Sequence, residues 1–109
     1  MLFSEDEFFE YMWMDVATAI VYWVDRERTE IGPGGLVVVP EGGTEEYTLS
    51  PSEFKKKVQE LAQAGHGFNS YSTKFYDNIR DGNYDAADYD ATIIDEAVQQ
   101  ALFDDVLYG

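Results

Sequence analysis

The chain has 109 residues, of which 22 are acidic and 7 basic, so its formal net charge is −15. Because 45% of the residues are hydrophobic and 16% are aromatic, the chain is too apolar to be a disordered acidic tail. Its length predicts a single compact domain over residues 1–109. The charge repels nucleic-acid phosphates and anionic lipid headgroups, which argues against direct binding to DNA, RNA or a membrane surface.

The residue types that many cofactor sites require are scarce. The sequence has no cysteine, which excludes disulfides, thiol nucleophiles and thiolate-held zinc or iron–sulfur clusters, and its one histidine is His66. The N-terminus is acidic, unlike a signal peptide, and the longest apolar run, residues 11–24, is too short to span a bilayer. We therefore expect a cytoplasmic protein without a metal or cofactor.

A long helix over residues 4–24 is the first predicted element. Ser4 and Glu7 fit a capping box, and Phe3 and Phe8 occupy the positions of a hydrophobic staple. Apolar residues then recur at helical spacing on both faces, which is typical of a helix buried centrally or against another chain. A homo-oligomer is therefore an alternative to a monomer. Its interface residues would be Tyr11, Met14, Val21 and Tyr22.

A small antiparallel sheet is predicted next. Residues 36–40 and 45–49 have the β-branched content and alternation of strands, and residues 41–44 between them tolerate the positive φ angles of a turn. A third strand is expected near residues 28–31. These segments predict a β-hairpin or a three-stranded sheet.

A second helix begins directly after the sheet. Ser50 is a typical N-cap, Pro51 suits the first helical position, and Glu53 completes a capping box. Gly65 is expected to end this helix. This helix has the clearest start and end pattern of any predicted element in the chain.

Two more helices are predicted in the last third. Apolar residues four apart over residues 71–79 indicate a short helix closed by Gly82. Asp88 or Asp90 can cap a last helix, whose apolar stripe lies within residues 94–102. With a short strand over residues 106–108, this order predicts an α+β fold of about four helices on a small antiparallel β-hairpin or three-stranded sheet.

The acidic residues fall into two blocks. Residues 1–53 hold 12 acids and 2 bases, residues 54–74 hold 1 acid and 4 bases, and residues 75–109 hold 9 acids and 1 base. The blocks are consistent with a solvated surface, with adaptation to high salt, or with a surface that imitates duplex phosphates and binds a basic protein. The candidate partner-binding residues are Glu5, Asp6, Glu7, Glu10, Asp77, Asp81, Asp85, Asp88 and Asp90.

The remaining chemistry is sparse. His66 stands between two glycines at a predicted helix end, where it is typical of a C-terminal cap rather than of a general base. The segment from Asp81 to Asp85 opens like a calcium-binding loop, but Ala86 and Thr92 stand where glycine and glutamate are needed. No catalytic constellation is found, so we do not expect an enzyme.

The segment from Ile79 to Phe103, together with Tyr108 and Gly109, resembles small acidic proteins of bacteriophages and mobile elements. The resemblance implies a phage-type accessory protein in the host cytosol that blocks a host nuclease or another DNA-binding defence factor, in some cases as a DNA mimic. We therefore expect an acidic inhibitor that binds a basic protein surface, and a homo-oligomeric structural protein is the alternative.

Overall fold

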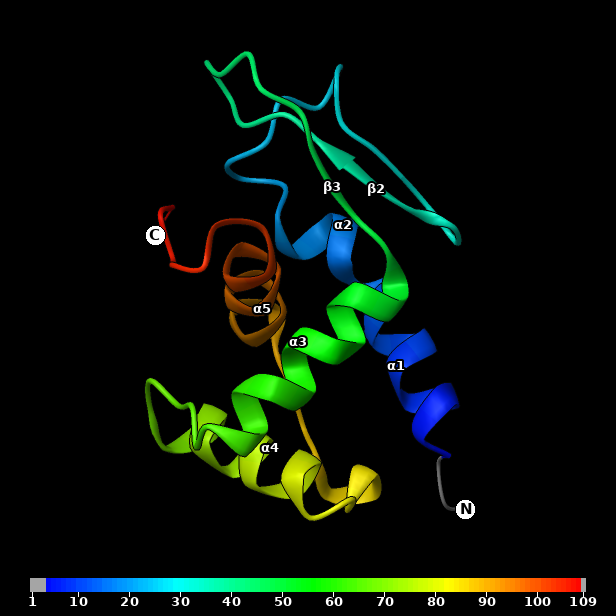
Figure 1. The fold of residues 1–109 in the computed structure, drawn as a ribbon, viewed down its shortest axis with the longest axis vertical. Coiled ribbons are helices and arrows are strands. Elements are labelled where there is room, and N and C mark those ends of the chain that lie inside the picture. The colour runs from blue at the N-terminus through cyan, green and yellow to red at the C-terminus, as the bar shows by residue number, and fades with distance from the viewer. Residues whose placement is uncertain (1–3, 109) are drawn as a thin grey trace.

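A computed structural model describes residues 4–108 and has an α+β fold (Figure 1). The three strands lie at one end of the molecule, α4 lies at the other end, and the remaining helices lie between them (Figure 1). The elements in chain order are α1 (Glu5–Met14), α2 (Val16–Ala19), β1 (Glu30–Gly32), β2 (Gly35–Val38), β3 (Tyr47–Leu49), α3 (Pro51–Gln63), α4 (Ser70–Arg80), the 3₁₀ turn η1 (Tyr84–Ala86) and α5 (Ala91–Phe103). The predicted fold class is confirmed.

The sheet is antiparallel throughout, with the strand order β1-β2-β3. Ile31 of β1 pairs with Leu36 of β2, and Val37 of β2 pairs with Thr48 of β3. The predicted hairpin and third strand are confirmed, although β1 begins at Glu30 instead of near residue 28.

The predicted first helix is interrupted at Asp15 and is wrong beyond Ala19. Helix α1 ends at Met14, Asp15 caps it, and α2 adds only four residues. The next backbone groups pair with the segment after β2 rather than with a preceding helical turn. The N–H of Asp25 donates to Val39 (2.7 Å), and the N–H of Glu41 donates to the carbonyl of Trp23 (2.9 Å). These long-range hydrogen bonds replace helical ones, so the apolar periodicity of residues 20–24 does not produce a helix. The expected staple includes Phe3, which lies outside the described residues.

The predicted caps of α3 and α5 are confirmed. The Ser50 hydroxyl accepts from the N–H of Glu53 and the Glu53 carboxylate accepts from the N–H of Ser50, which is the complete capping box. Gly65 follows α3 with φ +69°, and the next N–H donates back into the helix, to Leu61. Asp90 caps α5 by accepting from the N–H of Ile93 at 2.9 Å.

The predicted third helix is α4, and Gly82 follows it with φ +73°. Its buried face consists of Ser72, Phe75, Tyr76 and Ile79, whereas Tyr71 is exposed. The strand expected over residues 106–108 is wrong, because its N–H groups donate to a side chain instead of to another strand. No helix within residues 4–108 is long and apolar enough to cross a bilayer.

Candidate partner-binding surface

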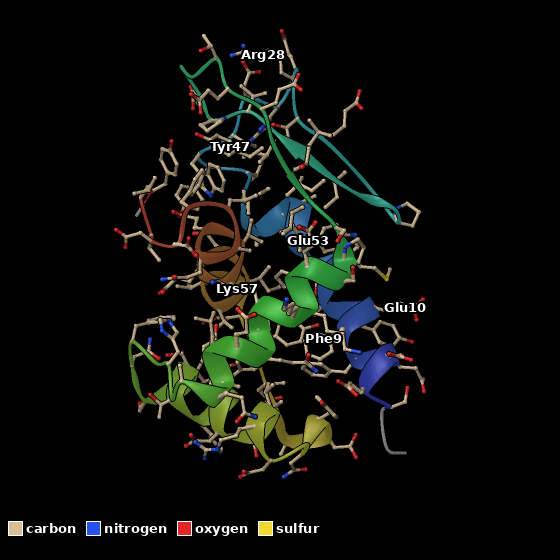
Figure 2. All side chains as sticks on the ribbon, viewed as in Figure 1. Phe9, Glu10, Arg28, Tyr47, Glu53 and Lys57 are labelled. Carbon is tan, nitrogen blue, oxygen red and sulfur yellow. The ribbon has the colours of Figure 1, made fainter. Side chains whose placement is uncertain are left out.

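Helix α1 has one buried and one exposed apolar side. Phe8, Phe9, Met12 and Trp13 are buried in the core. Tyr11 and Met14 point away from it and are 54% and 73% exposed. Figure 2 shows Phe9 between α1 and α3, and Glu10 on the outer side of α1. We call Tyr11 and Met14 the α1 ridge.

A groove of about 870 Å³ lies on one side of the α1 ridge. Its far wall is formed by the turn after β1 and the first turn of α3, and the buried side chains of Phe9 and Trp13 contribute to its lining. The indole N–H of Trp13 donates to the carbonyl of Gly32 (3.0 Å), which holds the wall against α1. Glu7 and Glu10 line this groove.

A second groove, of about 480 Å³, lies on the other side of the same ridge. Its far wall is the segment 84–89, and its acidic lining residues are Asp15, Asp85 and Asp88. The Tyr89 hydroxyl donates to the Asp15 carboxylate at 3.4 Å, which joins the two walls.

Aromatic packing brings these two acidic blocks together. The ring of Phe8 in α1 lies 5.2 Å from that of Tyr84 and 5.8 Å from that of Tyr89, centroid to centroid. Because these contacts fix η1 against α1, carboxylates about 75 residues apart in the sequence flank one exposed ridge. We call this surface the acidic α1 face. It consists of Glu7, Glu10, Tyr11, Met14, Asp15, Asp85 and Asp88.

Several of the predicted partner-binding acids already have internal cationic partners. Lys55 of α3 lies 3.5 Å from the Glu5 carboxylate and 3.1 Å from that of Asp6. Its hydrogen bond to Asp6 is the main reason that the pKa of Lys55 is raised. Arg80 likewise pairs with Asp77 (3.3 Å) and Asp81 (3.5 Å) at the end of α4. The charge of these four carboxylates is therefore partly balanced within the protein.

The remaining predicted carboxylates also differ in their surroundings. Glu7 accepts a hydrogen bond from the Ser4 hydroxyl at 3.0 Å. Asp90 is exposed but serves as the N-cap of α5. Glu10 and Asp88 are exposed, and no ion pair is found for either among residues 4–108.

The four predicted oligomer-interface residues do not share one helical face. Tyr11 and Met14 form the α1 ridge, whereas Val21 and Tyr22 follow α2 in a turn. The Tyr22 hydroxyl donates to the Asp95 carboxylate, and its partial burial and this acidic neighbour raise the pKa of Tyr22 to about 12. The Tyr22 hydroxyl thus joins the turn after α2 to helix α5 of the same chain.

A polar cluster that the sequence did not reveal lies between Trp23, α5 and the C-terminal tail. The buried Asp95 carboxylate accepts from Trp23 Nε1 at 2.7 Å and from Gln99 Nε2 at 3.1 Å. Gln99 Oε1 accepts from the N–H groups of Leu107 and Tyr108, each at 2.8 Å. The available signal was a pair of polar residues four apart, Asp95 and Gln99, on an otherwise apolar helix.

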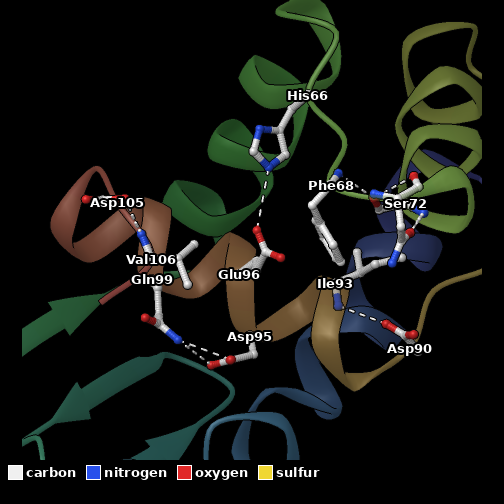
Figure 3. A network of polar contacts seen from close by, with 11 residues as sticks. His66, Phe68, Ser72, Asp90, Ile93, Asp95, Glu96, Gln99, Asp105 and Val106 are labelled. Carbon is white, nitrogen blue, oxygen red and sulfur yellow. Dashed lines mark hydrogen bonds and ion pairs between the residues drawn. The ribbon is translucent and has the colours of Figure 1, made fainter. Parts of the chain in front are cut away.

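His66 combines the expected helix-end position with an unexpected side-chain contact. Its Nε2 lies 3.7 Å from the Glu96 carboxylate of α5, as Figure 3 shows, and its ring packs on that of Tyr76. Burial is the main reason that the pKa of Glu96 is raised. Among residues 4–108, no three histidine or carboxylate side chains are placed to hold a metal ion.

Comparison with protein-family models, with curated protein sequences and with solved structures gave no match.

Proposed function

We propose that this protein binds a basic surface on another protein through the acidic α1 face and has no catalytic role. One observation carries the proposal: carboxylates from both acidic blocks flank an exposed apolar ridge on a folded helix. The carboxylates would attract and orient a cationic partner, and the ridge would supply apolar area to bury.

The charge of the whole molecule supports the same direction of recognition. A chain with a formal charge of −15 is steered toward cationic surfaces and away from phosphates and anionic lipids. Among the described residues that line the two grooves, Lys55 is the one basic side chain, and Glu5 and Asp6 already engage it. The surface is therefore complementary to lysine and arginine.

The partner class we propose is a DNA-processing protein, such as a nuclease or a DNA-binding defence factor in the cytosol of a bacterial host. Surfaces that bind DNA are much more positive than ordinary protein interfaces. In its narrower form, the proposal is that this chain inhibits its target by occupying the DNA-binding surface as a mimic.

A homo-oligomer is the second candidate, and the exposure of Tyr11 and Met14 favours it. An apolar ridge on a small domain is a common position for a subunit interface. A two-fold contact at the ridge would, however, bring like-charged carboxylates of two copies together. Light scattering at low and high salt distinguishes the candidates. A dimer at both salt concentrations supports the oligomer, and a monomer at both contradicts it.

The proposal is tested by capture from bacterial lysate with matched baits. The baits are the wild type, the double variant Glu10→Lys/Asp88→Lys in the face, and the control Glu41→Lys/Glu46→Lys in the loop before β3. Both variants change the formal charge equally and replace exposed side chains. We expect a basic DNA-processing protein on the wild-type and control baits that is released by about 1 M salt, where the screening length is about 3 Å, and is displaced by added duplex DNA. Equal capture by all three baits would contradict the proposal.

A further inference from the structure

The larger groove beside the α1 ridge combines an apolar interior with an acidic edge. Phe9 and Trp13 line it from the core side, and the exposed side chains of Met14, Ile31 and Pro33 add apolar surface. Glu7 and Glu10 stand at the same groove on α1. Its volume of about 870 Å³ is large enough for several side chains of a partner.

The walls of this groove are firmly held. The hydrogen bond from Trp13 to Gly32 fixes the turn after β1, and the capping box at Ser50 fixes the first turn of α3. Lys55 of α3 also lines the groove and is held by Glu5 and Asp6. Its ammonium lies 5.6 Å from the centre of the Phe9 ring. The groove is therefore formed before any partner binds, which lowers the entropic cost of docking.

The charge at the edge selects the occupant. A neutral apolar segment would desolvate Glu7 and Glu10 without pairing them, which costs free energy. An acidic segment, or a second copy of this face, would add repulsion between carboxylates. A segment with lysine or arginine beside its apolar side chains would pair the edge and fill the interior at once.

We propose that the groove receives an amphipathic, lysine- or arginine-rich segment of the partner protein, with its large apolar side chains against Met14, Ile31 and Trp13. This inference rests on the proposed function and adds a specific anchor to it. Electrostatic attraction would bring the partner to the face, and burial of its apolar side chains in the groove would slow its release.

Substitution of Met14 by aspartate distinguishes apolar burial in the groove from electrostatic attraction to the acidic α1 face. The aspartate makes the face more acidic, so electrostatics alone would leave binding of a cationic segment unchanged or tighter. Loss of the apolar contact would weaken it. Met14 is 73% exposed, so the substitution leaves the core intact. The matched control is Leu107→Asp, which adds the same charge at another exposed apolar residue, 57% exposed and outside the groove.

The probe is a fluorescein-labelled amphipathic peptide of leucine and lysine, and its binding is measured by fluorescence anisotropy. The comparison peptides replace every lysine by glutamate, or every leucine by serine. We expect the leucine–lysine peptide to bind the wild type and Leu107→Asp equally, and Met14→Asp about tenfold more weakly, a difference of about 1.4 kcal/mol. Both comparison peptides should bind more weakly than the leucine–lysine peptide.

The same assay separates failure of the groove from failure of the proposed function. If Glu10→Lys/Asp88→Lys weakens binding while Met14→Asp binds like Leu107→Asp, the acidic face stands and the groove proposal is overturned. If the double variant binds like Glu41→Lys/Glu46→Lys, the proposed function falls, and the groove proposal falls with it. Equal binding of the glutamate peptide, or a dimer that Met14→Asp dissociates, would also overturn the groove proposal.

Discussion

At the scale of single residues, the buried carboxylate of Asp95 is the side chain that depends most on its hydrogen-bond donors. Burial of a charge is costly unless donors compensate for it, and here Trp23, Tyr22 and Gln99 supply them. Gln99 in turn binds the backbone of Leu107 and Tyr108, and the Tyr108 ring stacks on that of Trp23 with centroids 4.8 Å apart. One carboxylate thus connects the residues after α2, helix α5 and the C-terminal tail.

Replacement of Asp95 by alanine should therefore lower the free energy of unfolding substantially. The change leaves the buried indole N–H of Trp23 without its acceptor, whereas the Gln99 amide keeps the Tyr108 carbonyl at 2.8 Å, so the cost is about 1–3 kcal/mol. Urea denaturation measures the difference. The exposed Glu46→Ala serves as control and should change stability by less than about 0.5 kcal/mol. Equal midpoints for the two variants would show that the cluster contributes nothing.

Tyr22 gives the molecule a specific alkaline pH dependence. Its pKa is raised from the ordinary value of 10.0 to about 12, first by partial burial and then by the Asp95 carboxylate. A phenol with a raised folded pKa stabilises the fold fully below pH 10, and this stabilisation is lost between pH 10 and 12 as the unfolded chain ionises first.

We therefore expect the stability difference between the wild type and Tyr22→Phe to shift against the wild type over this range. Urea denaturation at pH 9 and at several values up to 12 measures it. Since the other tyrosines titrate in both proteins, a pH-independent difference would contradict the hydroxyl-to-carboxylate contact.

At the scale of elements, the sequence predicts helix ends that local residues determine, but not those that long-range contacts determine. Helix α3 was predictable because Ser50, Pro51 and Glu53 satisfy the helix start within a few residues, and Gly65 supplies the left-handed backbone at its end. The end of α1 was not, because the bonds that replace the helix join Trp23 and Asp25 to residues after β2. A periodic apolar run contains no sign of partners that lie elsewhere in the chain.

The candidate site was predictable in part for the same reason. The sequence located the acidic blocks and the apolar second side of α1, and it identified most carboxylates of the acidic α1 face. It could not show that Lys55 pairs with Glu5 and Asp6, about 50 residues away, or that Asp15 belongs to the face. Both depend on how α1 packs against α3 and against the segment 84–89.

The capping box provides a direct test at this scale. Ser50→Ala removes the acceptor of the Glu53 N–H, whose hydrogen bond is 3.1 Å long, and should cost about 1 kcal/mol of stability. Ser70→Ala, at the exposed first residue of α4, is the control and should be nearly neutral. Thermal or urea unfolding followed by circular dichroism measures both. A neutral Ser50→Ala would show that the box does not hold the groove wall formed by α3.

At the scale of the whole molecule, the acidic residues can attract a basic partner only where their charge is not paired with lysine or arginine of the same chain. Lys55 pairs with two carboxylates in the first turn of α1, and Arg80 pairs with two at the end of α4. The acidic α1 face keeps Glu10 and Asp88 exposed on the two sides of an apolar ridge. We propose that this combination, rather than net charge alone, makes the face a recognition surface.

The central claim is tested most directly by the salt dependence of binding to the basic protein that we expect the wild-type bait to capture. Dissociation constants are measured by calorimetry from about 0.05 to 0.5 M salt for the wild type, Glu10→Lys/Asp88→Lys and Glu41→Lys/Glu46→Lys. We predict that binding weakens steeply with salt for the wild type and the control. The variant in the face should bind at least about tenfold more weakly at low salt and show a shallower slope. Identical curves for the two variants would contradict the assignment of binding to the acidic α1 face.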